Sequence, residues 1–473
     1  MSAQNTPESP KRGRRWAATS ARVVVGLAVG AGLVIVGIGA IAAPWPQLTR
    51  AAVTVTATPA PDASVVTCAG PLLAIGRTAT QAGGLSFAAP QSVLSGVAPV
   101  SPSASSTTVT APGVSGSAGA LTFTAPPGSA GRTDLAASGS SSVEAPDLRG
   151  LAVSGCRGPL SETWLVGGAT TTGSADLVVL SNPGAVPATV QLTVYGGKGG
   201  QTAPGGTVVV APGTQRVVPL AGLLLGEPAP VVRVTATGAP VQATIQTSLT
   251  RVLTPGGVEQ VGPAPGLAPT VVIPGVVVPT SVPMAAGNTT TVLRMLAPSS
   301  AANAKITVTP VGGADVPGDT IPLAAGVPAQ VDLSGLTPGT YTIRVDADQP
   351  IVGAAWQATG LGQGSDFAWF AAAPAVSGQT VLPVPAGPAP VLAAWNPTDA
   401  VQTISLQPAS GTPVSLSVPA HGSASAPVVA GTVYTMTASG PVQSAVSFSG
   451  AGALSSLTVW PAQAAAATVV VAP

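Results

Sequence analysis

Three similar segments recur along the chain, each an apolar run that ends in a turn containing proline. They are residues 177–184, 292–299 and 391–398. The prolines of these turns, Pro183, Pro298 and Pro397, are 115 and 99 residues apart. A period of this length predicts a chain built from consecutive units of about 100 residues.

Each unit has the pattern of a β-rich module. After the proline turn, residues 188–194, 304–308 and 401–406 largely alternate apolar with polar side chains, which is typical of a half-buried strand. Each unit then closes in a predicted β-hairpin around Pro240, Pro350 or Pro441. Six to eight short strands in about 100 residues fit an antiparallel sandwich.

We therefore predict an all-β fold of tandem antiparallel β-sandwich (Ig-like) modules at residues 160–265, 270–365 and 367–462. A poorer, cysteine-containing module covers residues 64–159, with a low-complexity insert at 99–144, and residues 463–473 form a tail. A β-propeller with four-stranded blades is the alternative, although its blades are shorter and more numerous than these units.

The N-terminus has the pattern of a membrane anchor. An uncharged apolar run at residues 23–43 would form a helix about 31 Å long, enough to cross a bilayer. Because the preceding segment 1–22 is basic, we expect it in the cytoplasm, and the chain from the Pro/Thr-rich stalk 44–63 onward outside the plasma membrane. A cleaved signal peptide is the alternative, because Ala40-Ile-Ala resembles a cleavage site. Gly26 and Gly30 form a GxxxG motif that would allow two helices to pair.

Composition excludes two classes of function. Only 7% of the residues are charged, too few for the surface and chemistry of a cytosolic metabolic enzyme. The 17 Lys and Arg residues nearly balance the 16 Asp and Glu residues, so there is no basic field for nucleic acid.

Cys68 and Cys156 are the only cysteines, and both follow the predicted anchor. An even number of cysteines in an oxidising compartment favours a disulfide, here across a loop that cannot bury much apolar surface. A metal pair or a redox motif is the weaker alternative, because no histidine or further cysteine lies near either residue.

No motif points to catalysis, a metal or a cofactor. Asp346 and Asp348 would be a carboxylate pair for calcium, but the equivalent positions of the other units hold Thr and Ser, which favours a turn. His421, the single histidine, occupies a turn position where another unit has Ala325. The acidic residues are scattered, so a pair for glycoside hydrolysis is not indicated, and we predict that the protein is not an enzyme.

The tryptophans are the most informative side chains in a chain with only 3% aromatic residues. Trp164 and Trp369 each introduce a module and are expected to seal a junction. The slot of Trp356 is polar in the other units, so this side chain is expected to face outward. As a set, Trp164, Trp356, Trp369 and Trp460 either anchor cores and junctions or form a surface on which sugars stack.

The stretch Glu162-Thr-Trp-Leu-Val-Gly-Gly, the strand and Asn-Pro-Gly turn at 177–184, and the segment 234–243 resemble a family of uncharacterised, membrane-anchored actinobacterial envelope proteins. The resemblance implies a location and tandem β-rich repeats, but no activity. We thus expect a non-catalytic scaffold in the cell envelope that contacts an envelope polymer or a membrane protein. A carbohydrate-binding or adhesion protein that uses exposed aromatic side chains is the alternative.

Overall fold

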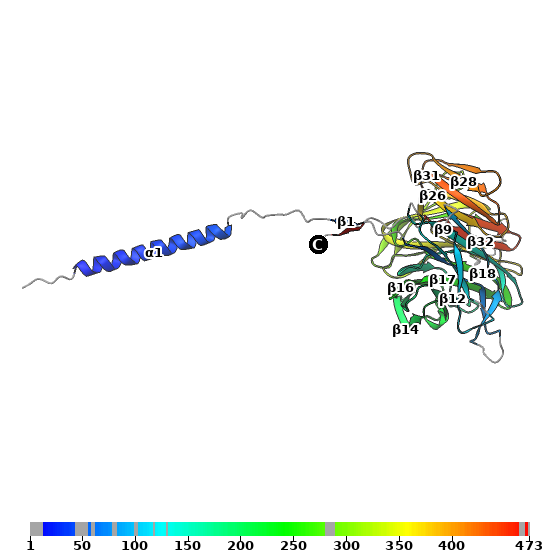
Figure 1. Cartoon of the computed structure of the whole chain (residues 1–473), viewed down its shortest axis with the longest axis horizontal. Helices are drawn as coiled ribbons and strands as arrows, with labels where there is room; N and C mark the ends of the chain where they lie inside the picture. Colours follow the sequence, from blue (N-terminus) through cyan, green and yellow to red (C-terminus); the bar gives the residue numbers. More distant parts are fainter. Residues whose placement is uncertain are drawn as a thin grey trace, which may run out of the picture. The chain divides into compact units, whose positions relative to one another are not determined.

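The computed structural model describes residues 13–42, 55–57, 62–77, 83–98, 103–116, 119–128, 131–279, 289–462 and 469–471. Strands make up 61% of the chain and helix 6%, so the predicted all-β class with one N-terminal helix is confirmed. The chain divides into two compact parts (Figure 1). One is the segment 60–466, called the body below, and the other combines Met1–Pro59 with Ala467–Pro473. Most of the predicted stalk 44–63 and tail 463–473 lies outside the described residues.

The smaller part contains helix α1 (Gly13–Ala42) and two short strands. From Arg22 to Gly39 the helix is long and apolar enough to cross a membrane, a property that signal sequences share. Strand β1 (Val55–Ala57) pairs antiparallel with β33 (Val469–Val471), so segments near the two ends of the chain lie side by side.

The first sandwich contains two four-stranded antiparallel sheets, in the orders β11-β16-β13-β14 and β15-β12-β17-β18. A 3-10 helix, η1 (Leu220–Gly222), lies between β15 and β16. The strands are β11 (Glu162–Val166), β12 (Leu177–Asn182), β13 (Ala188–Gly196), β14 (Gly199–Val210), β15 (Thr214–Pro219), β16 (Val231–Thr237), β17 (Gln242–Arg251) and β18 (Thr254–Val261).

The second and third sandwiches have the same order of strand pairing. Their strands are β19 (Ala268–Val278), β20 (Thr291–Leu296), β21 (Ala302–Pro310), β22 (Val316–Leu323), β23 (Ala329–Asp332), β24 (Gly339–Ala358) and β25 (Phe367–Ala371), then β26 (Ala375–Val384), β27 (Val391–Trp395), β28 (Gln402–Pro408), β29 (Val414–Val418), β30 (Ser423–Pro427), β31 (Thr432–Gly450) and β32 (Ala453–Thr458). In each, one long strand joins both sheets. The first half of β24 pairs with β19 and β21, and its second half pairs with β20 and β25; β31 does the same with β26, β28, β27 and β32.

The predicted hairpins around Pro240, Pro350 and Pro441 are wrong. Pro350 and Pro441 lie inside the long strands β24 and β31, and Pro240 lies between β16 and β17, which belong to different sheets. Proline has no N–H to donate to a sheet, so it suits the point where the strand changes partners. The prolines thus indicate a break in regular strand pairing, but at these points the chain passes from one sheet to the other and does not reverse its direction.

The turns at Asn182-Pro183 and Asn396-Pro397 are each held by the asparagine side chain. The Asn182 amide donates to the carbonyl oxygens of Val186 (2.8 Å) and Val210 (3.0 Å). Asn396 donates in the same way to Ala400 (2.7 Å) and Val418 (3.2 Å). Both asparagines are fully buried, so one side chain fixes the turn and ties it to a neighbouring strand.

The N-terminal unit, residues 64–159, contains three three-stranded sheets, in the orders β10-β9-β5, β2-β8-β6 and β3-β4-β7. Its strands are β2 (Ser64–Thr67), β3 (Leu72–Ile75), β4 (Leu85–Ala89), β5 (Ser92–Ala98), β6 (Ser105–Val109), β7 (Val114–Ser115), β8 (Ala120–Ala125), β9 (Asp134–Glu144) and β10 (Arg149–Cys156). The described parts of the low-complexity segment 99–144 are therefore largely strand. Strand β9 buries hydroxyl side chains, including Ser138 and Ser141, where a typical core has apolar ones.

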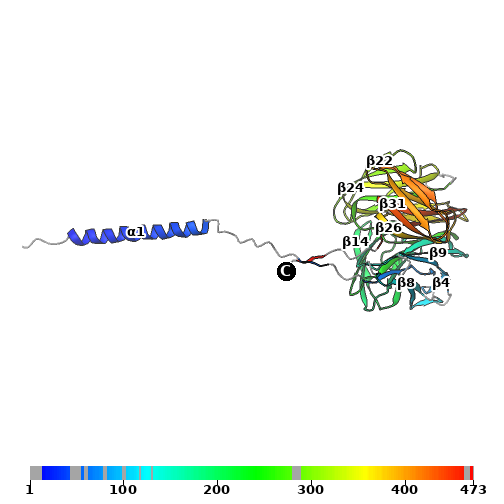
Figure 2. The same ribbon diagram turned by 45° about the horizontal axis from the view of Figure 1, so that its top comes forward.

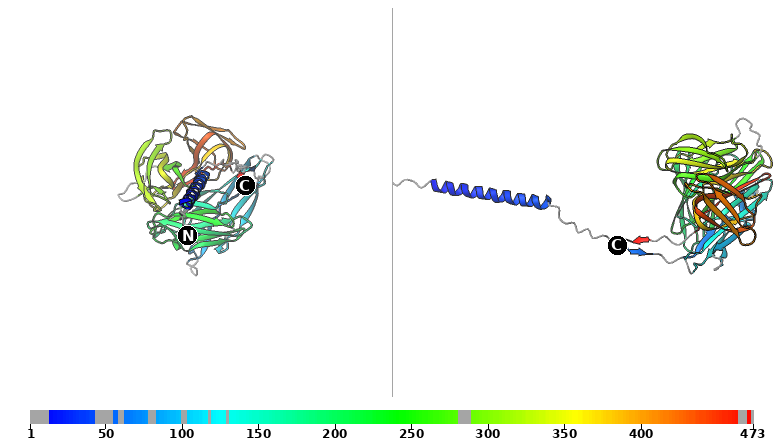
Figure 3. Two further views of the ribbon diagram at one scale, coloured as in Figure 1. Left: turned by 90° about the vertical axis from the view of Figure 1, so that its left-hand side faces the viewer. Right: turned by 90° about the horizontal axis from the view of Figure 1, so that it is seen from above.

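The four units of the body follow one another around a centre, in chain order (Figure 3, left). Figure 2 shows the second and third sandwiches, with β24 and β31, on one side of the body and β4 and β8 of the N-terminal unit on the other. The third sandwich also contacts the N-terminal unit, where Ser138 Oγ donates to the Pro383 carbonyl (2.8 Å). The ring of units is thus closed, and we call this last contact the seam.

Two buried carboxylates lie where the units meet. Asp366, which precedes β25, accepts backbone N–H groups from Leu151 in β10 (2.9 Å), Leu454 in β32 (3.2 Å) and Val258 in β18 (3.3 Å). Glu259 in β18 accepts from Val153 N–H (3.3 Å) and from the Ser455 hydroxyl (2.7 Å). Edge strands of three units, β10, β18 and β32, thus satisfy N–H groups on side chains of neighbouring units, and the second sandwich supplies Asp366 as an acceptor.

A strained residue lies at the tip of the β17–β18 hairpin. Val252 has φ 59°, a left-handed conformation that costs a β-branched residue about 1–2 kcal/mol. Val252 is 96% exposed and the next residue, Leu253, is 87% exposed, so burial does not compensate for this strain. Only the first of these two central residues has positive φ, which is the pattern of a type II′ turn, where glycine is preferred.

Replacement of Val252 by glycine is expected to raise the free energy of unfolding by about 0.5–1 kcal/mol. The gain is the relieved strain minus the extra chain entropy that glycine gives the unfolded state. Thermal or urea unfolding of the two proteins measures the difference. Leu253→Gly is the control, because its φ is not positive, and it should not stabilise. Equal stabilisation by both substitutions would contradict the strain.

Candidate functional site

Two of the cavities at junctions between units of the body are lined by tryptophans singled out in the sequence. The smaller one, about 230 Å³, lies between the first and second sandwiches. Trp356 in β24 and Trp369 in β25 line it as cross-strand neighbours, together with Phe367. The rings of Trp356 and Phe367 are 6.0 Å apart. Two of the four tryptophans singled out in the sequence therefore share one cavity.

The charged groups of this smaller cavity, Arg294 and Asp176, are already bonded within the protein. Arg294, in β20, is buried over the Trp369 ring (4.6 Å). Its guanidinium donates to the carbonyl oxygens of Gly168 (2.8 Å), Pro230 (2.9 Å) and Pro228 (3.1 Å), all in the first sandwich. Burial lowers the pKa of Arg294 to about 9. These hydrogen bonds join two sandwiches and leave few donors of the Arg294 guanidinium free for a ligand.

Asp176 lines the same cavity and is also bonded internally. Its carboxylate accepts the backbone N–H groups of Ala169 (2.6 Å) and Ser248 (2.9 Å). Burial raises the pKa of Asp176 to about 7, against the opposing effect of these two bonds and of the Arg294 charge. The carboxylate holds two loops of the first sandwich together, which is a structural task.

The larger cavity, about 590 Å³, lies at the seam between the N-terminal unit and the third sandwich. Ala63 and Ala462 both line it, so the chain enters and leaves the body beside this cavity. Its walls are mostly apolar and rich in proline, with Arg132, Asp134, Arg157 and Trp460 among them. A volume of this size lies within the roughly 300–1,000 Å³ of small-molecule sites.

Arg157 and Trp460 form one end of the seam cavity. The Arg157 guanidinium lies 4.9 Å from the centre of the Trp460 ring, and its Nη2 donates to the Thr458 carbonyl (2.6 Å) and hydroxyl (3.3 Å). The indole Nε1 of Trp460 donates to the same hydroxyl (3.0 Å). Burial lowers the pKa of Arg157 to about 9. Both side chains are thus fixed by one residue of the third sandwich.

Asp134 and Arg132 contribute opposite charges from the N-terminal unit. The Asp134 carboxylate accepts the backbone N–H of Val381 across the seam (2.8 Å), and burial raises its pKa to about 6. Arg132 donates to the Ala63 carbonyl through Nη2 (3.2 Å), whereas its buried Nε has no hydrogen-bond partner. The seam cavity therefore contains charged groups whose bonding capacity is only partly used.

The predicted tryptophans do not form one flat surface. Trp164 is 3% exposed, with Nε1 donating to Glu162 (2.9 Å) and its ring 5.5 Å from that of Tyr195. Trp369 is 6% exposed in the same apolar cluster. Trp356 and Trp460 are only partly buried, and each lines a cavity.

The slot of Trp356 faces the preceding unit in all three sandwiches. At the equivalent position, Gln246 exchanges two hydrogen bonds with the backbone of Leu73 (2.7 and 2.8 Å), and Ser447 donates to the Gly275 carbonyl (2.5 Å). The polar pattern of this slot therefore comes from contacts between units. A polar residue in a strand therefore does not show whether its side chain faces solvent or a neighbouring unit.

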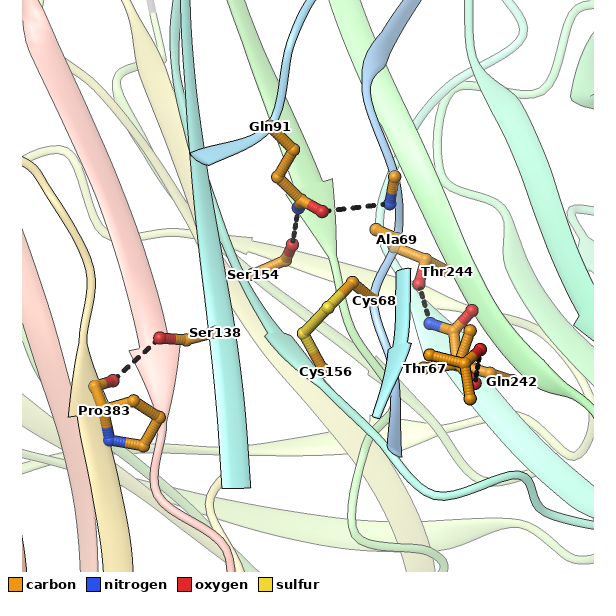
Figure 4. Close-up of a disulfide and its surroundings, with 12 residues drawn as sticks. Thr67, Cys68, Ala69, Gln91, Ser138, Ser154, Cys156, Gln242, Thr244 and Pro383 are labelled. Atoms are coloured by element: carbon orange, nitrogen blue, oxygen red, sulfur yellow. Dashed lines mark hydrogen bonds between the residues drawn. A yellow bond between two sulfur atoms is a disulfide. The ribbon is translucent and has the colours of Figure 1, made fainter. Parts of the chain in front are cut away.

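The disulfide between Cys68 and Cys156 is present, as the sequence predicts (Figure 4). Both cysteines are buried. Beside them, the residues Thr67 and Arg157 exchange backbone hydrogen bonds (2.9 and 3.0 Å), so the two segments that contain the cysteines run antiparallel at this point. The disulfide thereby holds Arg157 at the wall of the seam cavity.

Within the described residues, no group of three or more His, Cys, Asp or Glu side chains is arranged to hold a metal ion. His421 is exposed at its turn with φ 48°, and its Nε2 lies 2.7 Å from Asp399 Oδ1. Sequence reasoning did not identify Arg157, Asp134 or Arg132. The one available indication was that Arg157 follows Cys156 at a position where Ala69 follows Cys68.

Comparison with known proteins gives a family but no activity. None of the curated proteins matches this sequence. A protein family of unknown function, DUF5719, matches residues 108–417, which includes part of the N-terminal unit, the first two sandwiches and half of the third. Since this match spans well over half of the chain, the protein belongs to the DUF5719 family.

Proposed function

We propose that this protein is a non-catalytic interaction protein of the cell envelope, in which helix α1 is an uncleaved anchor and the body lies outside the membrane. The observation that carries the proposal is the buried disulfide in a body that follows an apolar N-terminal helix. Structural disulfides form and persist outside the cytoplasm. The proposed location is the actinobacterial cell envelope that the resemblance implies.

The way the buried acids are used supports a non-catalytic role. Asp366, Glu259 and Asp176 each accept backbone N–H groups, and these bonds hold strands or loops in place. A catalytic carboxylate would need a free oxygen directed at a substrate. The ring instead presents its surface and its seam cavity, which suits binding to a polymer or to another protein.

The experiment combines membrane fractionation with the redox state of the cysteines. The full chain, expressed in a bacterial host, is expected in the membrane fraction, and a variant without residues 1–43 in the cytoplasm. A maleimide reagent that adds mass should label the denatured full chain only after reduction, whereas the truncated protein should be labelled without reduction. Free thiols in the membrane-bound full chain would contradict an extracytoplasmic body.

A second candidate function is binding of carbohydrate. Trp460 favours it, because a partly exposed indole lines a cavity of sufficient size beside charged groups. This candidate assigns the binding of carbohydrate to the seam cavity.

A further inference from the structure

We propose that the seam cavity binds a sugar that carries a carboxylate group. The inference deepens the proposed envelope function, on which it rests, by assigning a ligand class to one site. It depends on the position of Arg157, on the separation of the charges in the cavity, and on the chemistry of the walls.

No carboxylate of the described residues forms an ion pair with Arg157. The ion pairs among the described residues involve other cations, which are Arg77, Arg149, Arg233, Arg344 and His421. The hydrogen bonds described for its side chain use only Nη2, directed at Thr458. A guanidinium has five N–H donors, and a partly desolvated cation without a counter-ion is costly. A carboxylate matches its planar donors in two parallel hydrogen bonds.

The cavity also contains an opposite charge. Asp134 lines the same cavity, yet it bonds to the Val381 N–H and forms no ion pair with an arginine of the described residues. The cavity therefore offers hydrogen-bond donors at Arg157 and a separate carboxylate acceptor at Asp134. A ligand that satisfies both has an acid group and hydroxyl groups on one small frame, which describes a sugar acid.

The charges of the cavity separate this ligand from other anions. Asp62 also lines the cavity, so two acidic and two basic side chains are present and their formal charges cancel. A dianionic phosphate would bring the formal charge of the site to −2 and would be repelled by the two acids, whereas a single carboxylate brings it only to −1. The apolar walls and the indole of Trp460 suit the apolar face of a sugar ring better than a linear acid.

The site is also held rigid before a ligand binds. The disulfide fixes the segment before Arg157, and the Thr458 hydroxyl receives hydrogen bonds from both Arg157 and Trp460. Side chains that are fixed in advance lose little entropy on binding. The cavity is therefore suited to select among related ligands.

The test uses the full chain in detergent micelles and isothermal titration calorimetry at pH 7.5. The three probes are cellobiouronic acid, its neutral counterpart cellobiose, and succinate. Saturable binding is expected for cellobiouronic acid, with at least tenfold weaker binding of cellobiose and of succinate. Equal binding of cellobiose would overturn the role of the carboxylate, and equal binding of succinate would overturn the role of the sugar ring. No binding of cellobiouronic acid would overturn the proposal as a whole.

Three variants locate the site. Arg157→Gln is expected to weaken binding of cellobiouronic acid by roughly tenfold to a hundredfold, the range for loss of a charged hydrogen bond. Trp460→Phe and Asp134→Asn should each weaken it several-fold, and they keep the test valid if Arg157→Gln does not fold. Unchanged affinity in the folded variants would overturn the assignment to this cavity.

The matched control is Arg233→Gln. Arg233 lies over the Trp164 ring at 5.5 Å, so it is also an arginine stacked on tryptophan, but outside the seam cavity. Its affinity should equal that of the unmodified protein, and a loss equal to that of Arg157→Gln would overturn the proposal. A failed titration with a protein that is membrane-bound and oxidised would remove this inference alone and leave the proposed envelope function standing.

Discussion

Replacing Asp366 by alanine is expected to destabilise the body by several kcal/mol. The substitution removes the acceptor of three backbone N–H groups, on Leu151, Val258 and Leu454, which belong to three different units. A buried N–H without a partner costs about 1–3 kcal/mol, and whole domains are stable by only about 5–15 kcal/mol. Urea unfolding, followed by tryptophan fluorescence, measures the loss.

Asp366→Asn is the matched control for this substitution. Asparagine keeps one acceptor oxygen at nearly the same position, so it should cost clearly less than alanine at pH 5. If alanine and asparagine destabilise the protein equally, the carboxylate is not the group that joins the units. The control also isolates the charge, because asparagine does not titrate.

The same carboxylate predicts how stability depends on pH. Burial raises the pKa of Asp366 to about 7, and burial together with the Asp366 charge raises the pKa of Glu259 well above its usual range. A raised pKa means that the folded state binds protons more tightly than the unfolded state. The contributions of these two groups to the free energy of unfolding are therefore complete below about pH 4 and are lost as pH rises toward 7. Unfolding free energies should therefore be lower at pH 8 than at pH 5, with a smaller difference in Asp366→Asn.

Loss of the disulfide is the second large effect. Cys156→Ala should lower the free energy of unfolding by about 4–5 kcal/mol, because the bond closes a loop between positions 88 residues apart. The unfolded chain gains the entropy of that loop when the bond is absent. Denaturant unfolding of the oxidised protein and the variant gives the difference, and reduction of the unmodified protein should produce nearly the same loss.

The two single variants and the double variant check that the bond is responsible. Cys68→Ala, Cys156→Ala and the double substitution all remove the same bond, so all three should have similar stabilities. A double variant whose loss equals the sum of the two single losses would show that each cysteine acts through its own packing. Both side chains are buried, so this alternative has a physical basis.

Local sequence patterns predicted the strands better than their partners. The largely alternating pattern at 401–406 predicts a strand, and the structure has one at Gln402–Pro408 with alternate residues buried, because the pleat places successive side chains on opposite faces. The sequence around Pro350 predicts the turn of a hairpin, whereas β24 continues through this residue into a second sheet. Whether a proline ends a strand or lets it change sheets depends on the neighbouring strands, and these are far away in sequence.

The seam cavity was beyond local patterns for the same reason. Its walls combine Asp134, Arg157 and Trp460, and no short segment contains more than one of these residues. Cys68 and Cys156 were predictable because so few cysteines leave one pairing. Arginine and aspartate are too common for a similar argument by elimination, so their meeting becomes visible only once the ring is closed.

The closed ring sets the order of events during synthesis of the chain, in which the N-terminal unit is made first. Val153 donates its backbone N–H to the Ser455 hydroxyl (2.8 Å), and Ser138 reaches Pro383, so early strands depend on residues synthesised hundreds of positions later. Contacts of such long range form slowly. The N-terminal unit therefore has unpaired strand edges until the last sandwich has been synthesised, and premature termination of synthesis leaves it exposed to proteases and to pairing with other chains.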